Sequence, residues 1–505
     1  MHRRSRRSRL PLRGLPWLLL VIAACSSPSG DDRLAIVVKL TGITPQIASL
    51  EVSAALNGKL ATNSTVSITA DLSEFVVYLP GTTDGTLDLD IGALPATPSC
   101  QLARAQLRTT VHPAPPRVIE LTAALQSASP PLCPLTVNLT GSGSVKAQPG
   151  ELLCNPTRCR GVFPQGSSVV LTAVPGSGGT NQVVWSPACS TPGTSCTVKL
   201  TQPLELTALF CNASGWCQHN APIKQTNLRG VWSSDRSNVW VVGAGGTVVH
   251  YDGKAWTTVP VVTNTNYSFY SVASTGPSDI VIGGSLQTSG TTGTQTEGAI
   301  FAYNGSTWTQ VATPARTVRD VWLASPTSGR AVGDAGLIYY RSGGSWTGAD
   351  LTNMGRVYWS TWSTGSTEYI VGTGGYIGLA TPGTTTVQPV TPSSPTPNTL
   401  VSVFGTSSTD VWAVGYSCTL AHYDGSWSVA PSSCASSSTT LNGVWGSSPS
   451  DYWAVGDSST ILHYNGVTWS AVGPGGTVPY RAVGGSSATN VWIVGDDGTI
   501  LQHAP

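Results

Sequence analysis

Arginine is the residue type in this chain whose spacing most strongly suggests chemistry. Arg229, Arg319 and Arg481 occupy the same place in three copies of an internal repeat, at the start of the strand expected to lie innermost. A guanidinium group binds a carboxylate or a phosphate through two parallel hydrogen bonds. If the innermost strands surround one axis, these side chains line one mouth of a channel, and we interpret them as candidate ligand-binding residues. The alternative is a solvated rim in which they pair with Asp235, Asp320 and other acids.

The histidines offer a second possible chemistry, metal binding. His250, His422 and His463 stand in one column of the repeat, but the other copies place other residue types there. Side chains of that column on different copies lie too far apart to share one ion, so the pattern favours hydrogen bonding within each copy. The sequence also has no Cys-x-x-Cys pair of the kind that binds zinc. It therefore predicts neither a metal site nor a cofactor.

Carboxylates could support glycoside hydrolysis, which usually needs two acids about 5–10 Å apart. The repeat region contains only Glu297 and Glu368 as glutamates. Its aspartates mostly stand at turn positions, where Asp is favoured because it bonds the local backbone. The Gly-Ala-Gly-Gly segment at 243–246 has no helix pattern after it, so it indicates a turn and not a nucleotide loop. No catalytic residue is predicted, and a binding protein is favoured over an enzyme.

These residues are positioned by a repeat that begins at Leu228. Each copy reads as four short strands, and an Asp-Gly or Asn-Gly turn leads into a fourth strand that opens with Trp. A period of about 40 residues with four strands per copy is typical of a β-propeller. The valine or isoleucine of the second strand marks seven copies, at positions 242, 282, 332, 371, 414, 455 and 494. We therefore predict a seven-bladed propeller over residues 211–505.

The seventh copy reaches Pro505 after only three strands. The segment 214–222 precedes the first copy as a fourth strand precedes the others, so we predict that it closes the ring beside the seventh copy. Tryptophans recur in the second and fourth strands. Such columns could form an aromatic platform for sugars, but the pattern favours packing of blade against blade.

The N-terminus reads as an export signal. Basic residues precede an apolar run from Leu15 to Ala24, which at about 10 residues is too short to cross a bilayer as a helix. The run ends Val-Ile-Ala-Ala-Cys25, which resembles the lipobox of bacterial lipoproteins. This resemblance implies a signal peptide over 1–24, a lipid on the Cys25 thiol and a tether over 25–32. By lipoprotein sorting rules, Ser26 favours the outer membrane, with the protein facing the periplasm or the cell surface.

The composition excludes several classes of protein. Only 10% of the residues are charged, and glycine and proline are abundant, with 56 and 35 copies. A helical bundle, a coiled coil and a charged disordered chain are therefore excluded. Loss of the leader removes six arginines and no acid, which takes the formal net charge from +1 to −5. The composition also argues against a nucleic-acid partner bound through bulk positive charge.

The cysteines fit an oxidising compartment. There are 11, and lipidation of Cys25 leaves an even number for disulfides. Sequence does not determine connectivity, but pairing of neighbours predicts the bridges Cys100–Cys133, Cys154–Cys159, Cys189–Cys196, Cys211–Cys217 and Cys418–Cys434.

Two β domains are expected before the propeller. Residues 33–127 contain alternating strands bounded by turn residues and predict a small β-sandwich. Residues 134–210, with Gly141-Ser-Gly-Ser-Val145, Phe163-Pro-Gln-Gly166 and Trp185, resemble the divergent internalin B-repeat domain. That resemblance implies a compact β module of bacterial surface proteins, which serves presentation or adhesion.

Two further resemblances bear on function. The turn His250-Tyr-Asp252-Gly-Lys-Ala-Trp256 is similar to the Asp-box of sialidases, although it is one residue shorter from Asp to Trp. The Trp-Val-Gly repeats are similar to those of photosystem-assembly propellers. We expect a lipid-anchored, non-catalytic surface protein whose propeller binds a protein or glycan. The alternatives are a sialidase-like glycoside-acting enzyme or lectin that uses the three arginines, and an envelope assembly factor.

Overall fold

The computed structural model describes residues 20–23, 33–44, 46–68, 74–80, 83–96, 99–113, 118–176, 179–189, 193–223, 225–261, 266–290, 293–350, 355–364, 366–390, 394–473 and 475–503. Cys25 lies outside these residues. The chain divides into two compact units. The first comprises Met1–Leu139, Gly143–Val174 and Thr194–Ala208, and the second comprises Thr140–Ser142, Pro175–Gly193 and Leu209–Pro505. Within the described ranges, we find no helix with the length and apolarity needed to cross a membrane.

The first unit contains the expected β-sandwich. One sheet has the order β5 (Glu74–Pro80), β2 (Arg33–Thr41) and β8 (Val118–Ala124), and β1 (Leu20–Ala23), which belongs to the predicted leader and not to the predicted sandwich, pairs with the outer edge of β5. The other runs β4 (Lys59–Ser67), β3 (Ser49–Leu56), β6 (Gly85–Leu94), β7 (Gln101–Val111) and β9 (Gln126–Thr140). Alternation in β6 sends Leu87, Leu89 and Ile91 into the core that both sheets share. The predicted all-β sandwich is confirmed.

A small β module follows the sandwich in sequence. Its strands are β10 (Gly143–Gln148), β11 (Leu153–Cys154), β12 (Arg158–Pro164), β13 (Ser168–Pro175), β14 (Gly179–Ser186), β15 (Ser195–Lys199) and β16 (Leu204–Asn212). Within the first unit, buried Arg160 donates from Nη1 to Ser53 Oγ at 2.6 Å and pairs with Glu51. This ion pair joins β12 to the sandwich strand β3. The resemblance to internalin B-repeats and the five-part domain division stay predictions.

The predicted disulfides are present. Four pairs are Cys100–Cys133, Cys154–Cys159, Cys211–Cys217 and Cys418–Cys434. Cys189 and Cys196 are also disulfide-bonded.

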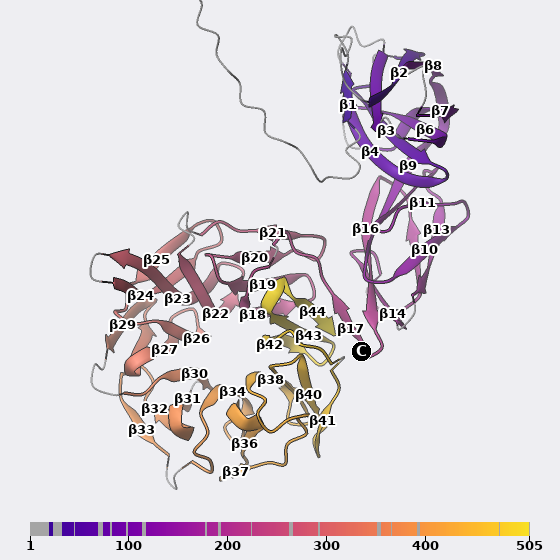
Figure 1. Cartoon of the computed structure of the whole chain (residues 1–505). Coiled ribbons are helices and arrows are strands. Elements are labelled where there is room, and N and C mark those ends of the chain that lie inside the picture. The colour runs from indigo at the N-terminus through magenta and orange to yellow at the C-terminus, as the bar shows by residue number, and fades with distance from the viewer. Residues whose placement is uncertain are drawn as a thin grey trace, which may run out of the picture. The chain divides into compact units, whose positions relative to one another are not determined.

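The second unit contains seven four-stranded antiparallel blades (Figure 1). Blade one consists of β18 (Leu228–Asp235), β19 (Asn238–Gly243), β20 (Val248–Tyr251) and β21 (Trp256–Thr258). Blade two consists of β22 (Tyr267–Gly276), β23 (Asp279–Gly290), β24 (Gly293–Tyr303) and β25 (Trp308–Ala312). Blade three consists of β26 (Val318–Ser325), β27 (Ser328–Gly333), β28 (Leu337–Ser342) and β29 (Ser345–Asp350). Blade four consists of β30 (Tyr358–Ser363), β31 (Glu368–Gly372), β32 (Tyr376–Ala380) and β33 (Val387–Pro389). Blade five consists of β34 (Leu400–Ser407), β35 (Asp410–Gly415), β36 (Thr419–Tyr423) and β37 (Trp427–Val429). Blade six consists of β38 (Leu441–Ser448), β39 (Asp451–Gly456), β40 (Thr460–Tyr464) and β41 (Trp469–Ala471). Blade seven consists of β42 (Tyr480–Ser487), β43 (Asn490–Gly495) and β44 (Ile500–His503), and β17 (Trp216–Gln218) is its fourth strand.

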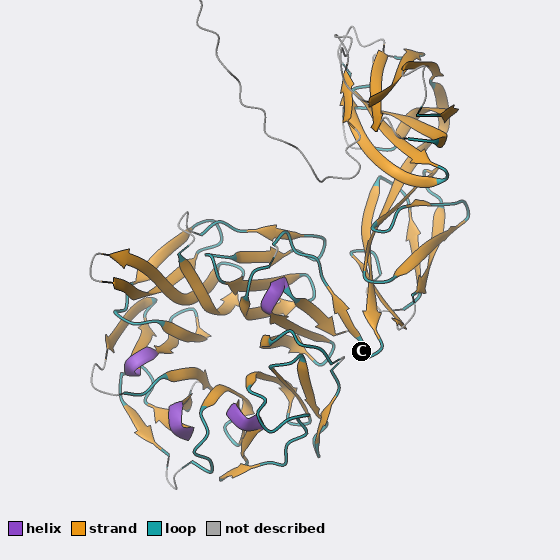
Figure 2. Cartoon of the chain, viewed as in Figure 1, coloured by secondary structure: helices purple, strands orange, loops and turns teal. Residues whose placement is uncertain are grey.

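The blades form a closed ring. Each innermost strand contacts the innermost strand of the next blade, and β42 of the last blade contacts β18 of the first. Short 3-10 helices follow the second strand of four blades (Figure 2): η1 (Asp334–Gly336), η2 (Thr373–Gly375), η3 (Tyr416–Cys418) and η4 (Asp496–Gly498).

Tryptophans pack blade against blade, as predicted. A second-strand aromatic ring meets the fourth-strand tryptophan of the next blade, with centroid separations of 5.1 to 6.0 Å. The pairs are Trp240–Trp308, Tyr369–Trp427, Trp412–Trp469, Trp453–Trp216 and Trp492–Trp256.

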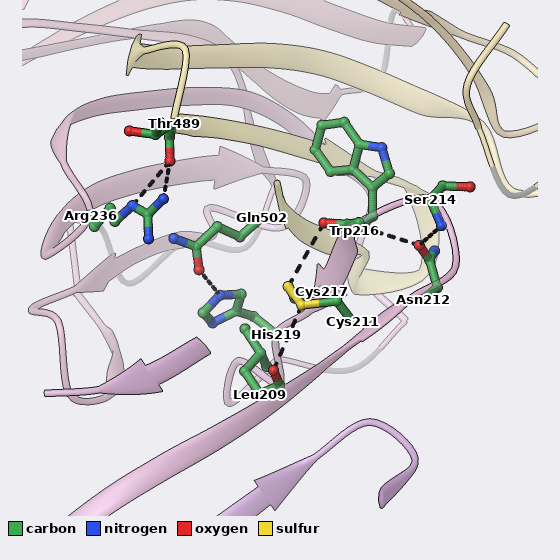
Figure 3. Close-up of a disulfide and its surroundings, with 11 residues drawn as sticks. Leu209, Cys211, Asn212, Ser214, Trp216, Cys217, His219, Arg236, Thr489 and Gln502 are labelled. Atoms are coloured by element: carbon green, nitrogen blue, oxygen red, sulfur yellow. Dashed lines mark hydrogen bonds between the residues drawn. A yellow bond between two sulfur atoms is a disulfide. The ribbon is translucent and has the colours of Figure 1, made fainter. Parts of the chain in front are cut away.

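The predicted closing strand is confirmed. Within 214–222, β17 pairs antiparallel with β44, with Trp216 opposite His503 and Cys217 opposite Gln502. The Cys211–Cys217 disulfide fastens β17 to β16 (Figure 3). Blade one is also tied to blade seven by Arg236, whose Nε donates to the carbonyl of Thr489 at 3.0 Å. The ring is therefore closed by backbone pairing and side-chain hydrogen bonds, and the disulfide anchors the closing strand to β16.

His219 is a buried polar residue at this closure. Its Nε2–H donates to Oε1 of Gln502 at 2.9 Å, and its Nδ1 accepts from the indole N–H of Trp256 at 3.2 Å (Figure 3 shows the Gln502 bond). The rings of Tyr251, Trp256 and Trp492 surround it. The imidazole is neutral in this arrangement because Nδ1 serves as an acceptor. Burial lowers the pKa of His219 to about 4.

We expect the free energy of unfolding to fall by about 3 kcal/mol between pH 6.5 and pH 4 on account of His219. The unfolded chain takes up this proton near pH 6.5, whereas the folded chain takes it up near pH 4. The unfolded state thus binds more protons in that window, so the stability is complete above it and is lost as the pH falls. Urea unfolding of the leaderless chain, followed by tryptophan fluorescence from pH 7 to pH 4, measures the slope.

His503 adds to the same slope, because burial also lowers its pKa to about 4. The variant His219→Phe is expected to flatten the slope while lowering the stability at pH 7. Val467→Ser, at an exposed residue that does not titrate, serves as the control and should leave the slope unchanged. An unaltered slope in His219→Phe would contradict the assignment.

Candidate functional site

A cavity of about 710 Å³ lies at the centre of the propeller. All seven innermost strands contribute to its wall. The residue that faces one mouth in each blade is called here the rim residue, and in blade order these are Arg229, Tyr270, Arg319, Trp359, Val401, Asn442 and Arg481. The sequence prediction that Arg229, Arg319 and Arg481 share one place in the repeat is thus consistent with the structure.

A β-bulge positions every rim residue. In each blade the pairing between first and second strands shifts register at this residue, as at Leu228/Gly230 and Val318/Asp320. The same shift occurs in the other five blades. A bulged residue has no partner opposite it, and the bulge turns its side chain away from the sheet. The seven bulges therefore direct seven side chains to one mouth of the cavity.

Two of the three arginines are held by aspartates of the following turn. Arg319 donates from Nε and Nη2 to the two carboxylate oxygens of Asp334, at 2.7 and 3.0 Å. Arg481 binds Asp496 in the same way, at 3.0 and 2.6 Å. These hydrogen bonds raise the pKa of Arg481. Each pair is locally neutral and rigid.

The rim alternative expected from sequence is found for these two arginines, but the two partners named for it, Asp235 and Asp320, were wrong. Asp235 accepts hydrogen bonds from the backbone N–H and hydroxyl of Ser237 in its own turn, at 2.7 and 2.6 Å. Asp320 binds serines of the neighbouring blades, as described below. The aspartates that do pair with the arginines lie 15 residues further along the chain. That spacing, which recurs in the repeat, was the available signal.

Arg229 differs from the other two. Across the described part of the chain it forms no ion pair, and its Nε has no hydrogen-bond partner. Its guanidinium carbon lies 4.7 Å from the ring centre of Tyr270. Arg319 lies 5.1 Å from the same ring and 4.8 Å from that of Trp359. Blades one to four thus present arginine and aromatic side chains in alternation, joined by cation–π contacts.

Asp320 is a cavity residue that sequence reasoning did not assign to the site. It follows the rim residue Arg319 and accepts four hydrogen bonds. Ser271 Oγ and the Val321 N–H reach Oδ1 at 2.6 and 2.9 Å. Ser360 Oγ and the Thr361 N–H reach Oδ2 at 2.8 and 2.9 Å. Burial raises the pKa of Asp320, although these bonds oppose the shift. The carboxyl group therefore links blades two, three and four.

The other end of the cavity is aromatic. Three residues beyond the rim residue, about 10 Å along the strand, several blades carry large rings. Neighbouring rings contact one another, with centroid separations of 5.9 to 6.4 Å, and the set comprises Trp322, Trp362, Phe404 and Trp445. The cavity thus has one charged mouth and one apolar end.

A second cavity, of about 1040 Å³, adjoins the charged mouth. It shares Tyr270 and Arg319 with the central cavity and is also lined by Glu297 and Arg316. The long β23–β24 hairpin of blade two supplies part of its wall, including Ser285, whose buried hydroxyl has no hydrogen-bond partner in the described residues.

The histidines have structural partners, as the sequence indicated. His250, His422 and His463 bond through Nε2 to Asn238, Asp410 and Asp451, and each stacks on the tryptophan of the second strand. Among the residues that the structure describes, no three His, Cys, Asp or Glu side chains are grouped to hold a metal ion. Glu368 is buried and pairs with Arg330.

The strand pairing and the ring of innermost strands define a β-propeller protein. No family model matches the chain, and no curated protein matches it. Among solved structures, it is similar to YCF48 bound to D1 peptide, with a TM-score of 0.46 and 18% identity over 58% of this chain and 97% of that one. YCF48 from Cyanidioschyzon merolae gives 0.45 and 16%, over 58% and 99%. The WD40 β-propeller domain of Doa1 gives 0.44 and 13%, over 56% and 94%.

Replacement of Asp320 is expected to destabilise the propeller. Asp320→Asn puts an amide N–H₂ where the carboxylate accepts two donors, and loss of bonds to a charged group costs about 1.5–3 kcal/mol. Urea unfolding at pH 7 measures the change. Asp497→Asn, at an exposed aspartate with φ 57°, is the control because Asn tolerates that backbone conformation. Equal stability of the two variants would show that Asp320 does not link the blades.

Proposed function

We propose that this chain is an exported, lipid-anchored bacterial surface protein whose propeller binds a protein or glycan at the charged mouth of its central cavity. One observation carries the proposal: rim residues from all seven blades converge on one cavity, and those of blades one to four alternate arginine with aromatic side chains. Arginine and large aromatic residues are the types that contribute most to binding energy at interfaces.

The state of the acids supports binding without catalysis. Asp334 and Asp496 are each held by both oxygens on an arginine. Asp320 already accepts four hydrogen bonds. A glycoside-acting enzyme needs one carboxyl group free to protonate the leaving oxygen and another free to attack or to activate water. Asp320, Asp334 and Asp496 are therefore committed to protein donors.

In this proposal the N-terminal part determines the localisation of the protein. The leader over 1–24 and the lipid on Cys25 would hold the chain at the outer membrane, facing the periplasm or the cell surface. The sandwich and the B-repeat-like module would then serve as the stalk that presents the propeller. The disulfides accord with an oxidising compartment.

The lipid anchor can be tested directly. In a diderm bacterium that expresses the full chain, metabolic labelling with a radioactive fatty acid should label the protein and place it in the outer-membrane fraction. Cys25→Ala should abolish both, because the thiol is the atom that takes the diacylglycerol. Cys418→Ala, which leaves Cys25 in place, is the control. Labelling that persists in Cys25→Ala would contradict the anchor.

The binding face can be tested with two exposed apolar residues. Tyr416 lines the cavity and is 46% exposed, whereas Val467 is 80% exposed and lies in a turn of blade six away from the cavity lining. The leaderless chain is probed against peptide and glycan arrays. For each saturable hit, Tyr416→Ser should weaken binding about tenfold, as expected for a loss of about 1.4 kcal/mol, and Val467→Ser should not. Equal effects of the two variants, or no saturable hit, would count against the proposal.

A further inference from the structure

The repeat pairs its rim residue with an aspartate at a fixed distance along the chain. Arg319 binds Asp334, Arg481 binds Asp496, and the amide of Asn442 donates to Asp457 at 3.1 Å. In every case the separation is 15 residues. In blade one the residue at that separation from Arg229 is Ala244.

The backbone at Ala244 is built like the backbone at the aspartates. The N–H of Ala244 donates to the carbonyl of Asn227 at 2.9 Å, two residues before the rim residue. The N–H groups of Asp334 and Asp496 donate to the equivalent carbonyls, of Thr317 and Pro479, at 3.1 and 3.0 Å. In all three turns the next two residues have positive φ. The Cα–Cβ bond of Ala244 therefore points toward its rim residue in the same direction as the Cα–Cβ bonds of Asp334 and Asp496.

Blade one thus keeps the arginine and the turn but lacks the carboxylate. In blades three and seven, the Nε and Nη2 atoms of the arginine hold that carboxylate side-on. In blade one the Nε of Arg229 is shielded from solvent and has no partner among the described residues. An unpaired, desolvated donor on a charged group costs free energy that an incoming acceptor recovers. Arg229 lines the central cavity, so such an acceptor can reach its guanidinium group from there.

We propose that Arg229 and the space beside Ala244 form a binding site for a single carboxylate group of a ligand. The ligand carboxylate takes the position that Asp334 and Asp496 take in their own blades and forms two parallel hydrogen bonds with the guanidinium. This inference rests on the proposed function, because it concerns the same mouth, and it names the chemistry that the mouth recognises.

The surrounding charges select one carboxylate over a polyanion. Asp457 and Asp496 line the same cavity on the side of blades six and seven, and Asp457 lies 3.7 Å from Arg481. A ligand with dense negative charge would meet these aspartates as it reached Arg229. A ligand with one carboxylate on an otherwise neutral body would not. Both acidic side chains of peptides and uronic-type sugars fit this description.

The test uses acetate as the probe and the Nε–H signal of Arg229 as the readout. In the leaderless chain labelled with ¹⁵N-arginine, that signal is assigned by its loss in Arg229→Lys. Acetate should shift it saturably, whereas chloride at equal ionic strength should not. In Ala244→Asp the signal should already lie near those of Arg319 and Arg481, and acetate should bind at least tenfold more weakly. Ala244→Gly, which leaves the space beside Arg229 open, is the control and should still respond.

Each outcome either supports or overturns the carboxylate site. No shift with acetate in the wild-type chain, or an equal shift in Ala244→Asp, would overturn the carboxylate site. An N-acetylated glutamate peptide and methyl glucuronide then distinguish the source of the carboxylate, by which one competes with acetate at lower concentration. If acetate binds but the arrays give no partner, the carboxylate site stands and the proposed function fails. If an array partner loses affinity in Tyr416→Ser but not in Ala244→Asp, the proposed function stands and this inference fails.

Discussion

A β-bulge in the innermost strand of every blade governs what this propeller presents at its mouth. Side chains of a regular strand alternate between the two faces of the sheet and would pack only against neighbouring blades. The bulge leaves one residue out of the ladder and directs it toward the cavity. Since the bulge recurs at an equivalent residue in all seven blades, substitutions at that residue change the mouth without disturbing the sheet. The arginines, Tyr270 and Trp359 are therefore variable in type but fixed in position.

The residue after the bulge holds the ring together. Ser271, Asp320, Ser360 and Ser402 each accept a hydrogen bond from a backbone N–H of the next blade, at 2.9 to 3.2 Å. Blades one and six instead have Gly230 and Gly443 there. A Cβ at either would lie 3.0 or 3.1 Å from a backbone atom of the following blade. The ring is thus joined by side-chain hydrogen bonds over one arc and by close backbone approach elsewhere.

Much of this architecture could be predicted from sequence because the repeat carries it. The period gave the blade number, and the unfinished seventh copy located the closing strand at 214–222, which pairs with β44. The ion-pair partners of the arginines could not be found so directly. They depend on a turn that returns to the rim 15 residues later, and the acids closest in sequence, such as Asp320, are directed elsewhere by the bulge. Asp235 was misassigned for a related reason, because an aspartate in a tight turn satisfies its own backbone first.

The departures from the repeat, more than the repeat itself, indicate where this protein differs in function from a bare scaffold. Blade one lacks the aspartate beside its arginine, blade two extends its central hairpin to Gly290 and Gly293, and blade three carries an acid where the other blades have Gly, Ser or Ala. These departures are adjacent in the ring, and Tyr270 and Arg319 belong to both cavities that they border. The features that all blades share account for the stability of a propeller. A cluster of features that occur in single blades therefore needs a cause other than stability. We propose that this cause is recognition of a ligand at the charged mouth.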